Sequence, residues 1–113
     1  MNLFRAIFGG VREISSDQYR QQFNDTPHIL IDIRNTQEYA SGHIQGSQNI
    51  PLNKLAKKLN KLPKQQPIVV VCRNGARGRE AVDMLQNAGF KASNLVGGVM
   101  NWRKDGGILS SSN

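Results

Sequence analysis

Residues 68–71 have the sequence Ile-Val-Val-Val, and this run constrains the fold of the chain more than any other feature. β-branched side chains favour extended backbone. A strand that is apolar on both faces must be covered on both faces, as in the middle of a parallel sheet with helices on each side. The run therefore predicts an α/β domain with its central strand at residues 68–71.

The patterns around this run predict alternating strands and helices. The other expected strands are residues 11–14, 28–33, 48–50 and 93–96. The expected helices are a segment capped by Ser15 with Gln18, a turn at residues 35–40, a leucine stripe, residues 78–88 and a final turn toward Trp102. The stripe consists of Leu52, Leu55, Ala56, Leu59 and Leu62. The alternation predicts one α/β domain with a mainly parallel sheet flanked by helices on both faces.

The 113 residues suffice for one domain with a real core. We expect an extension at residues 1–10, a domain at residues 11–106 and a tail at residues 107–113 that frays from Ser110. The N-terminal residues do not resemble a signal peptide. They predict a helical turn docked on the domain, with an oligomer or membrane-surface contact as the alternative. No apolar run is long enough to span a membrane, and the mean hydropathy is -0.48.

Positive charge is concentrated in one stretch of the chain. Residues 52–79 carry eight Lys and Arg and no acidic residue, whereas the formal net charge of the whole chain is +7. This local field favours anions. The stretch contains no aromatic side chain for stacking on bases, so we expect no nucleic acid partner. A solvated helix face is the simplest interpretation, and a surface for a small anion or an acidic partner is the alternative.

Cys72 is the single cysteine of the chain. An intramolecular disulfide and a zinc site built on several cysteines are therefore excluded. A lone cysteine fits a reducing compartment, so we expect a cytoplasmic protein. The sequence contains no cluster of metal ligands, and we expect neither a metal nor an organic cofactor.

The candidate chemistry lies directly after the central strand. Cys72 is the first residue after this strand, and ligands in open α/β sheets bind beyond the carboxyl ends of the strands. A loop between this residue and a helix at residue 78 can direct backbone N–H groups and the helix dipole at the sulfur, which favours a thiolate. The loop residues, which we expect to bind an anionic substrate, are Arg73, Asn74, Gly75, Ala76 and Arg77. A buried, unreactive cysteine is the alternative.

Several motifs resemble those of the rhodanese (thiosulfate sulfurtransferase) superfamily over roughly residues 12–104. They are Leu30-Ile31-Asp32-Ile33-Arg34, Glu38-Tyr39, Gly42-His43-Ile44-x-Gly46, Asn49-Ile50-Pro51, the Cys72–Arg77 loop and Leu95-x-Gly97-Gly98-x-x-x-Trp102. One such motif is weak, but this ordered set is specific. Four residues separate Cys72 from Arg77, whereas the related phosphatase loops have five, so the spacing resembles that of the sulfurtransferases.

The resemblance implies an activity. Cys72 would be the nucleophile, and a thiosulfate-like anion would be the sulfur donor. A persulfide would then pass the sulfur to a thiol, cyanide or a protein acceptor. The alternative is a non-enzymatic rhodanese-like module that regulates, carries or binds sulfur.

Five further residues are expected to support the site. Asp32 and Arg34 would form a pair that orients loops, and Glu38 would pair with Arg34 across the turn. By resemblance, His43 is structural rather than a base. Gly78 departs from the Ser or Ala common in the family, and we expect it to loosen the first turn of the helix.

Overall fold

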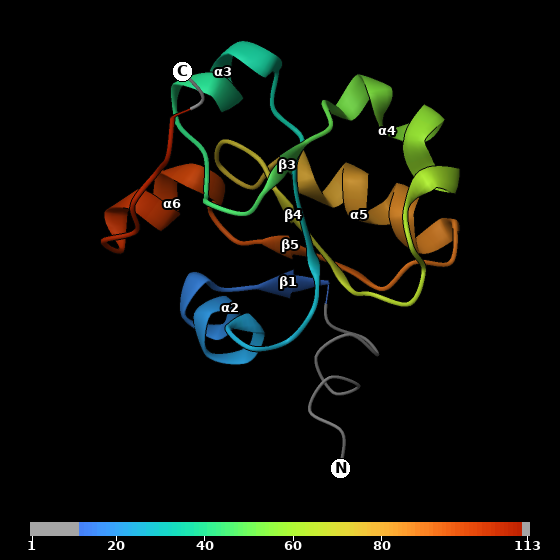
Figure 1. Ribbon diagram of the computed structural model, residues 1–113, viewed down its shortest axis with the longest axis horizontal. Coiled ribbons are helices and arrows are strands. Elements are labelled where there is room, and N and C mark those ends of the chain that lie inside the picture. Colours follow the sequence, from blue (N-terminus) through green and yellow to red (C-terminus); the bar gives the residue numbers. More distant parts are fainter. Residues whose placement is uncertain (1–11, 112–113) are drawn as a thin grey trace.

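All five strands of the sheet run parallel, in the order β1-β5-β4-β2-β3 (Figure 1). The computed structural model describes residues 12–111. The strands are β1 Glu13–Ile14, β2 Ile29–Asp32, β3 Gln48–Asn49, β4 Ile68–Val71 and β5 Ala92–Leu95. The Ile-Val-Val-Val run forms β4, which is the middle strand in the order across the sheet. This confirms its predicted central position.

The helices follow in alternation with the strands, as predicted. They are α2 Ser16–Phe23, α3 Thr36–Ser41, α4 Leu52–Lys58, the 3-10 helix η1 Leu59–Lys61, α5 Gly78–Asn87 and α6 Gly98–Lys104. The capping box of Ser15 and Gln18 is present at the start of α2. Asn35 and Glu38 form a second capping box on α3. These side chains satisfy backbone N–H groups that have no partner within the helix.

Strand β4 is buried on both faces because its side chains alternate between two helical layers. Ile68 and Val70 belong to a core cluster with residues of α4 and α5, whereas Val69 and Val71 belong to a second cluster with residues of α2 and α6. Figure 1 shows these two pairs of helices on opposite sides of the sheet. All four side chains are 0% exposed, and burying each stabilises the fold by about 1.5–3 kcal/mol.

Two expectations about helices are partly wrong. The leucine stripe does not continue in one α-helix, because α4 ends at Lys58 and η1 follows. Ala56 was expected in the apolar stripe but is exposed, while Leu55 is fully buried. The contribution of α4 and η1 to the core on this side therefore comes from their leucines, which pack beside residues of α5.

The C-terminal segment returns to the domain. Ser110 and His43 exchange two backbone hydrogen bonds of 2.8 and 2.9 Å, so fraying does not begin at Ser110. The indole Nε1 of Trp102 donates to the carbonyl of Ile108 at 3.3 Å. The expected helical turn at residues 1–10 lies outside the described residues. None of the helices found between residues 12 and 111 combines the length and apolar character that crossing a membrane requires.

Candidate active site at the end of the central strand

Cys72 follows β4 directly and lies at the base of a loop that leads into α5. Its side chain is 3% exposed, and the backbone N–H of Gly75 donates to its Sγ at 2.8 Å. Gly75 adopts a φ of 93°, a region that residues with a β-carbon rarely occupy. The glycine at this position therefore lets the loop turn back on the sulfur and place an N–H group against it.

The loop is also fastened from the side by the beginning of α6. Val99 donates its backbone N–H to the carbonyl of Cys72 at 2.9 Å, and Met100 donates to that of Arg73 at 3.0 Å. A β-carbon at Gly98 would lie 2.2 Å from the Cys72 carbonyl oxygen. The close approach of the two backbones thus depends on Gly98, which has a positive φ.

The other loop N–H groups are not all directed at the sulfur. Ala76 donates its N–H to Oδ1 of Asn74 at 3.0 Å. The described contacts to Sγ from loop N–H groups consist of the Gly75 bond alone. The side chain of Asn74 thus holds the far side of the loop.

Gly78 is buried at the start of α5, and the reason is Asn94 on β5. A β-carbon at Gly78 would lie 1.8 Å from Oδ1 of Asn94. The Asn94 side chain is in turn hydrogen-bonded through Nδ2 to the carbonyl of Gly75 at 2.9 Å. The glycine therefore makes room for a buried amide that holds the loop.

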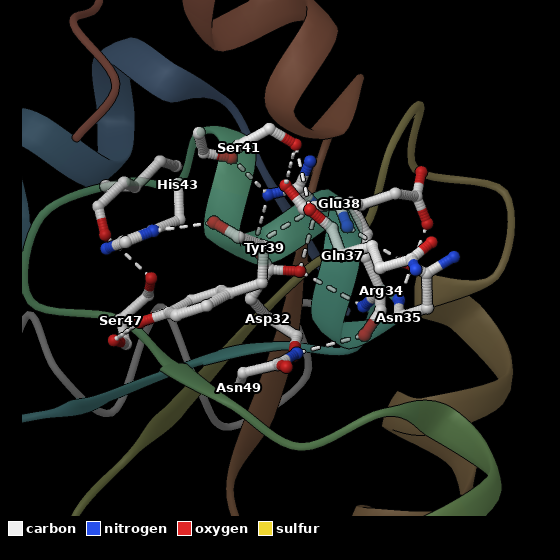
Figure 2. A network of polar contacts seen from close by, with 12 residues as sticks. Asp32, Arg34, Asn35, Gln37, Glu38, Tyr39, Ser41, His43, Ser47 and Asn49 are labelled. Carbon is white, nitrogen blue, oxygen red and sulfur yellow. Dashed lines mark hydrogen bonds and ion pairs between the residues drawn. The ribbon is translucent and has the colours of Figure 1, made fainter. Parts of the chain in front are cut away.

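Asp32 and Arg34 form a largely buried pair beside the loop (Figure 2). Arg34 donates through Nη2 to Asp32 Oδ2 at 2.8 Å and to the carbonyl of Gly42 at 2.6 Å. Asn49 donates to the carbonyls of both members of the pair at 2.9 Å. The pair connects β2, β3 and the end of α3.

Glu38 does not pair with Arg34, contrary to the expectation. Its carboxylate accepts from the backbone N–H of Asn35 at 3.4 Å instead, as part of the α3 cap (Figure 2). Arg34 is already engaged by Asp32, whose two carboxylate oxygens match the planar guanidinium. Glu38 and Arg34 nevertheless lie in the wall of the same cavity.

His43 lies away from the cavity that contains Cys72. Its ring stacks on that of Tyr39 with centroids 3.9 Å apart, and its Nδ1 is 2.8 Å from the Tyr39 carbonyl oxygen (Figure 2). It does not line the Cys72 cavity. This placement supports a structural role.

Cys72 opens into a cavity of about 440 Å³. Arg73, Asn74, Ala76 and Arg77 of the expected binding loop line it, whereas Gly75 is buried behind them. The guanidinium groups of Arg73 and Arg77 make no hydrogen bond or ion pair with any described residue. Two cationic side chains that have no partner among the described residues lie beside a buried sulfur, and they favour the binding of a small anion. Residues 12–111 contain no group of three or more side chains suited to holding a metal ion.

Residues 15–105 match the family model of the rhodanese-like domain. The chain belongs to the rhodanese family. A sulfurtransferase of Allochromatium vinosum is 34% identical over 98 residues, which cover 85% of this chain and 92% of that protein. A Bacillus subtilis protein, provisionally named sulfur carrier protein YrkF, is 31% identical over 94 residues, covering 81% of this chain and 51% of YrkF.

A solved structure agrees with this assignment. The rhodanese-like domain protein from Staphylococcus aureus has a TM-score of 0.81 and 27% identity, covering 91% of this chain and all of that one. The relatives support a rhodanese-like sulfurtransferase or sulfur carrier, and the expected α/β fold class is confirmed.

Sequence reasoning missed two contributors to the site. One is Asn94 in the short strand β5. The other is the pair of backbone bonds from Val99 and Met100, which join segments more than 20 residues apart. A polar residue in a strand expected to be buried is the signal that could have indicated Asn94, because buried polar groups need a partner.

Proposed function

We propose that this rhodanese-like domain is a sulfurtransferase that carries a sulfane sulfur as a persulfide on Cys72. The observation that carries the proposal is the 2.8 Å contact between the Gly75 N–H and Sγ. An N–H group at this distance stabilises negative charge on the sulfur, both in the thiolate and in the persulfide. The beginning of α5 and the two loop arginines add positive potential at the same place.

The donor half-reaction uses thiosulfate or a similar anion. The donor would lie in the 440 Å³ cavity near Arg73 and Arg77. The Cys72 thiolate attacks the outer sulfur, a new S–S bond forms, and the old one breaks. Its electron pair leaves with sulfite, so no outside oxidant or cofactor is required. The result is covalent catalysis with two separate half-reactions.

In the second half-reaction, a thiol, cyanide or a protein acceptor attacks the outer sulfur of the persulfide. Cys72 leaves as a thiolate and the enzyme is restored. We also propose a cytoplasmic location, because a single reactive cysteine is compatible with a reducing compartment.

Intact-protein mass spectrometry tests the proposal. Thiosulfate should add the mass of one sulfur atom, and cyanide should remove it with formation of thiocyanate. Cys72→Ser should abolish both changes, because the chain has no other cysteine. Sulfur loading that persists in Cys72→Ser would overturn the assignment of the nucleophile.

A second candidate is a sulfur carrier or regulatory module that does not turn over small molecules. The similarity to YrkF favours this candidate. A carrier would receive sulfur from a protein persulfide but would produce thiocyanate from thiosulfate and cyanide no faster than Cys72→Ser. Steady-state turnover above that background supports the enzyme instead.

A further inference from the structure

A second, larger cavity adjoins the one that contains Cys72. This acceptor groove, as we call it below, has a volume of about 740 Å³ and shares Arg34, Glu38 and Arg73 with the Cys72 cavity. Its far wall consists of α6 and the returning C-terminal segment, including Met100, Arg103, Lys104 and Leu109. Its volume lies in the range of small-molecule sites. A ligand in the groove would therefore lie beside the sulfur.

The charge of the groove is positive. Arg73, Arg103 and Lys104 line it and are exposed, while Glu38 is its acidic residue. The side chains of these three cations make no hydrogen bond or ion pair with the rest of the described chain. Arg34 is different, because Asp32 neutralises it. Three cations and one carboxylate give the lining of the groove a net charge of +2, which favours an anionic ligand.

The groove also has an apolar part. Met100 is 56% exposed, and it is one of three exposed large apolar side chains among the described residues. Leu109 and Val99 lie along the same groove. A ligand with a short aliphatic body and negatively charged ends would match this combination of surfaces.

We propose that the groove binds the sulfur acceptor and that this acceptor is a small thiol bearing carboxylates. This inference rests on the proposed function, since it needs a persulfide on Cys72. Arg103 and Lys104 would bind the carboxylates while the thiol reaches past Arg73 to the persulfide. The acceptor thiolate attacks the outer sulfur, a new S–S bond forms, and the bond to Cys72 Sγ breaks with its electron pair kept by Sγ. The acceptor leaves as a persulfide, with no other reactant needed.

The cations of the groove have a second effect. The persulfide and the incoming thiolate are both anionic and repel each other. Positive side chains near the approach path reduce this repulsion and raise the local concentration of anionic thiols. The preference for an anionic thiol should therefore weaken as the salt concentration rises.

The experiment measures discharge of the preformed persulfide by two probes, mercaptosuccinate and uncharged 2-mercaptoethanol. The quantity is the ratio of their second-order rate constants, from the loss of the added sulfur by mass spectrometry. For Arg103→Gln combined with Lys104→Gln, we expect this ratio to fall about five- to tenfold, because exposed charge pairs make only modest contributions. Lys57→Gln combined with Lys58→Gln removes the same charge from α4, outside the groove, and should change the ratio by less than about twofold.

The outcomes separate the two proposals. Failure of thiosulfate to load the wild-type protein would overturn the proposed function. Normal loading with an equal ratio in the groove variant and the wild type would overturn the acceptor groove alone. An equal fall in both double variants would show a general charge effect and also overturn it. Discharge by acidic thiol-bearing proteins with no preference for mercaptosuccinate over 2-mercaptoethanol would replace the small acceptor with a macromolecular one.

Discussion

Asn94 fills the space that a side chain at Gly78 would need, with Oδ1 1.8 Å from the position of the missing β-carbon. The two residues lie on β5 and α5, and a side chain at Gly78 would have to displace the Asn94 amide. Asn94 is 1% exposed, and its amide holds the Gly75 carbonyl, one peptide from the N–H group that contacts Cys72. Packing at Gly78 is thereby coupled to the geometry of the sulfur.

Gly78→Ala should destabilise the protein and disturb the loop. The added methyl group must displace a buried amide, and overpacking of this kind typically costs about 1–3 kcal/mol. We expect a lower free energy of unfolding in urea and slower alkylation of Cys72 at a given pH. Asn94→Ser removes the obstructing amide, so Gly78→Ala with Asn94→Ser should be less destabilised than the sum of the single variants. Additive effects would show that the two positions are not coupled.

Arg77→Ala should lower kcat/KM for thiosulfate at least about tenfold, which is roughly 1.4 kcal/mol of transition-state stabilisation. The guanidinium lines the Cys72 cavity and can bind two oxygens of an anion at once. Alkylation of Cys72 at a fixed pH should also become slower, because a cation that favours the reactive thiolate is lost. Arg77→Lys should recover part of the loss, since it keeps the charge but not the geometry.

Arg79→Ala is the matched control for Arg77→Ala. Arg79 is an exposed arginine of the same helix end, but it lies near Glu13 and outside the Cys72 cavity. Its loss should change kcat/KM by less than about threefold, as expected for a screened charge. Equal losses of kcat/KM in both variants would assign the effect to the overall electrostatic field of the protein and not to a contact made by Arg77.

Neutralising the basic face of α4 and η1 should change thiosulfate turnover by less than about threefold. The variant replaces four exposed lysines with glutamine at Lys54, Lys57, Lys58 and Lys61. Exposed charges are screened over a Debye length of about 8 Å at physiological salt. Steady-state turnover measures the effect. A selective loss with a protein acceptor would identify a docking surface, and a large loss with thiosulfate itself would contradict the solvated-face interpretation.

Tyr19 should make the protein less stable in alkaline solution. Burial raises its pKa from 10.0 to about 12, and its hydroxyl is 2.7 Å from Nε2 of His28. The unfolded chain releases this proton near pH 10, whereas the folded chain keeps it until about pH 12. Deprotonation thus favours unfolding, and the contribution present below pH 10 is lost as the pH rises from 10 to about 12.

Urea unfolding at several pH values measures this contribution. The free energy of unfolding should fall more steeply over this pH window in the wild type than in Tyr19→Phe, which cannot titrate. The same slope in the wild type and in Tyr19→Phe would contradict a contribution from Tyr19.

The sequence by itself determined the order and type of the elements and the position of the candidate nucleophile. Hydrophobic periodicity and capping side chains act over a few residues, so the β4 run and the Ser15 cap are visible in the chain alone. Cys72 could be placed for the same reason, because a residue that follows a buried parallel strand lies at its carboxyl end. Tertiary structure decided which groups meet there.

The sequence shows both Asp32 and Glu38 as partners for Arg34, and only the packed fold selects Asp32. The space for Asn94 beneath Gly78, the bonds from α6 to the loop and the return of Ser110 to His43 likewise join distant segments. Such contacts depend on close packing between elements, which no local pattern encodes. The acceptor groove is likewise decided by tertiary structure, because its walls come from α3, the Cys72 loop and α6.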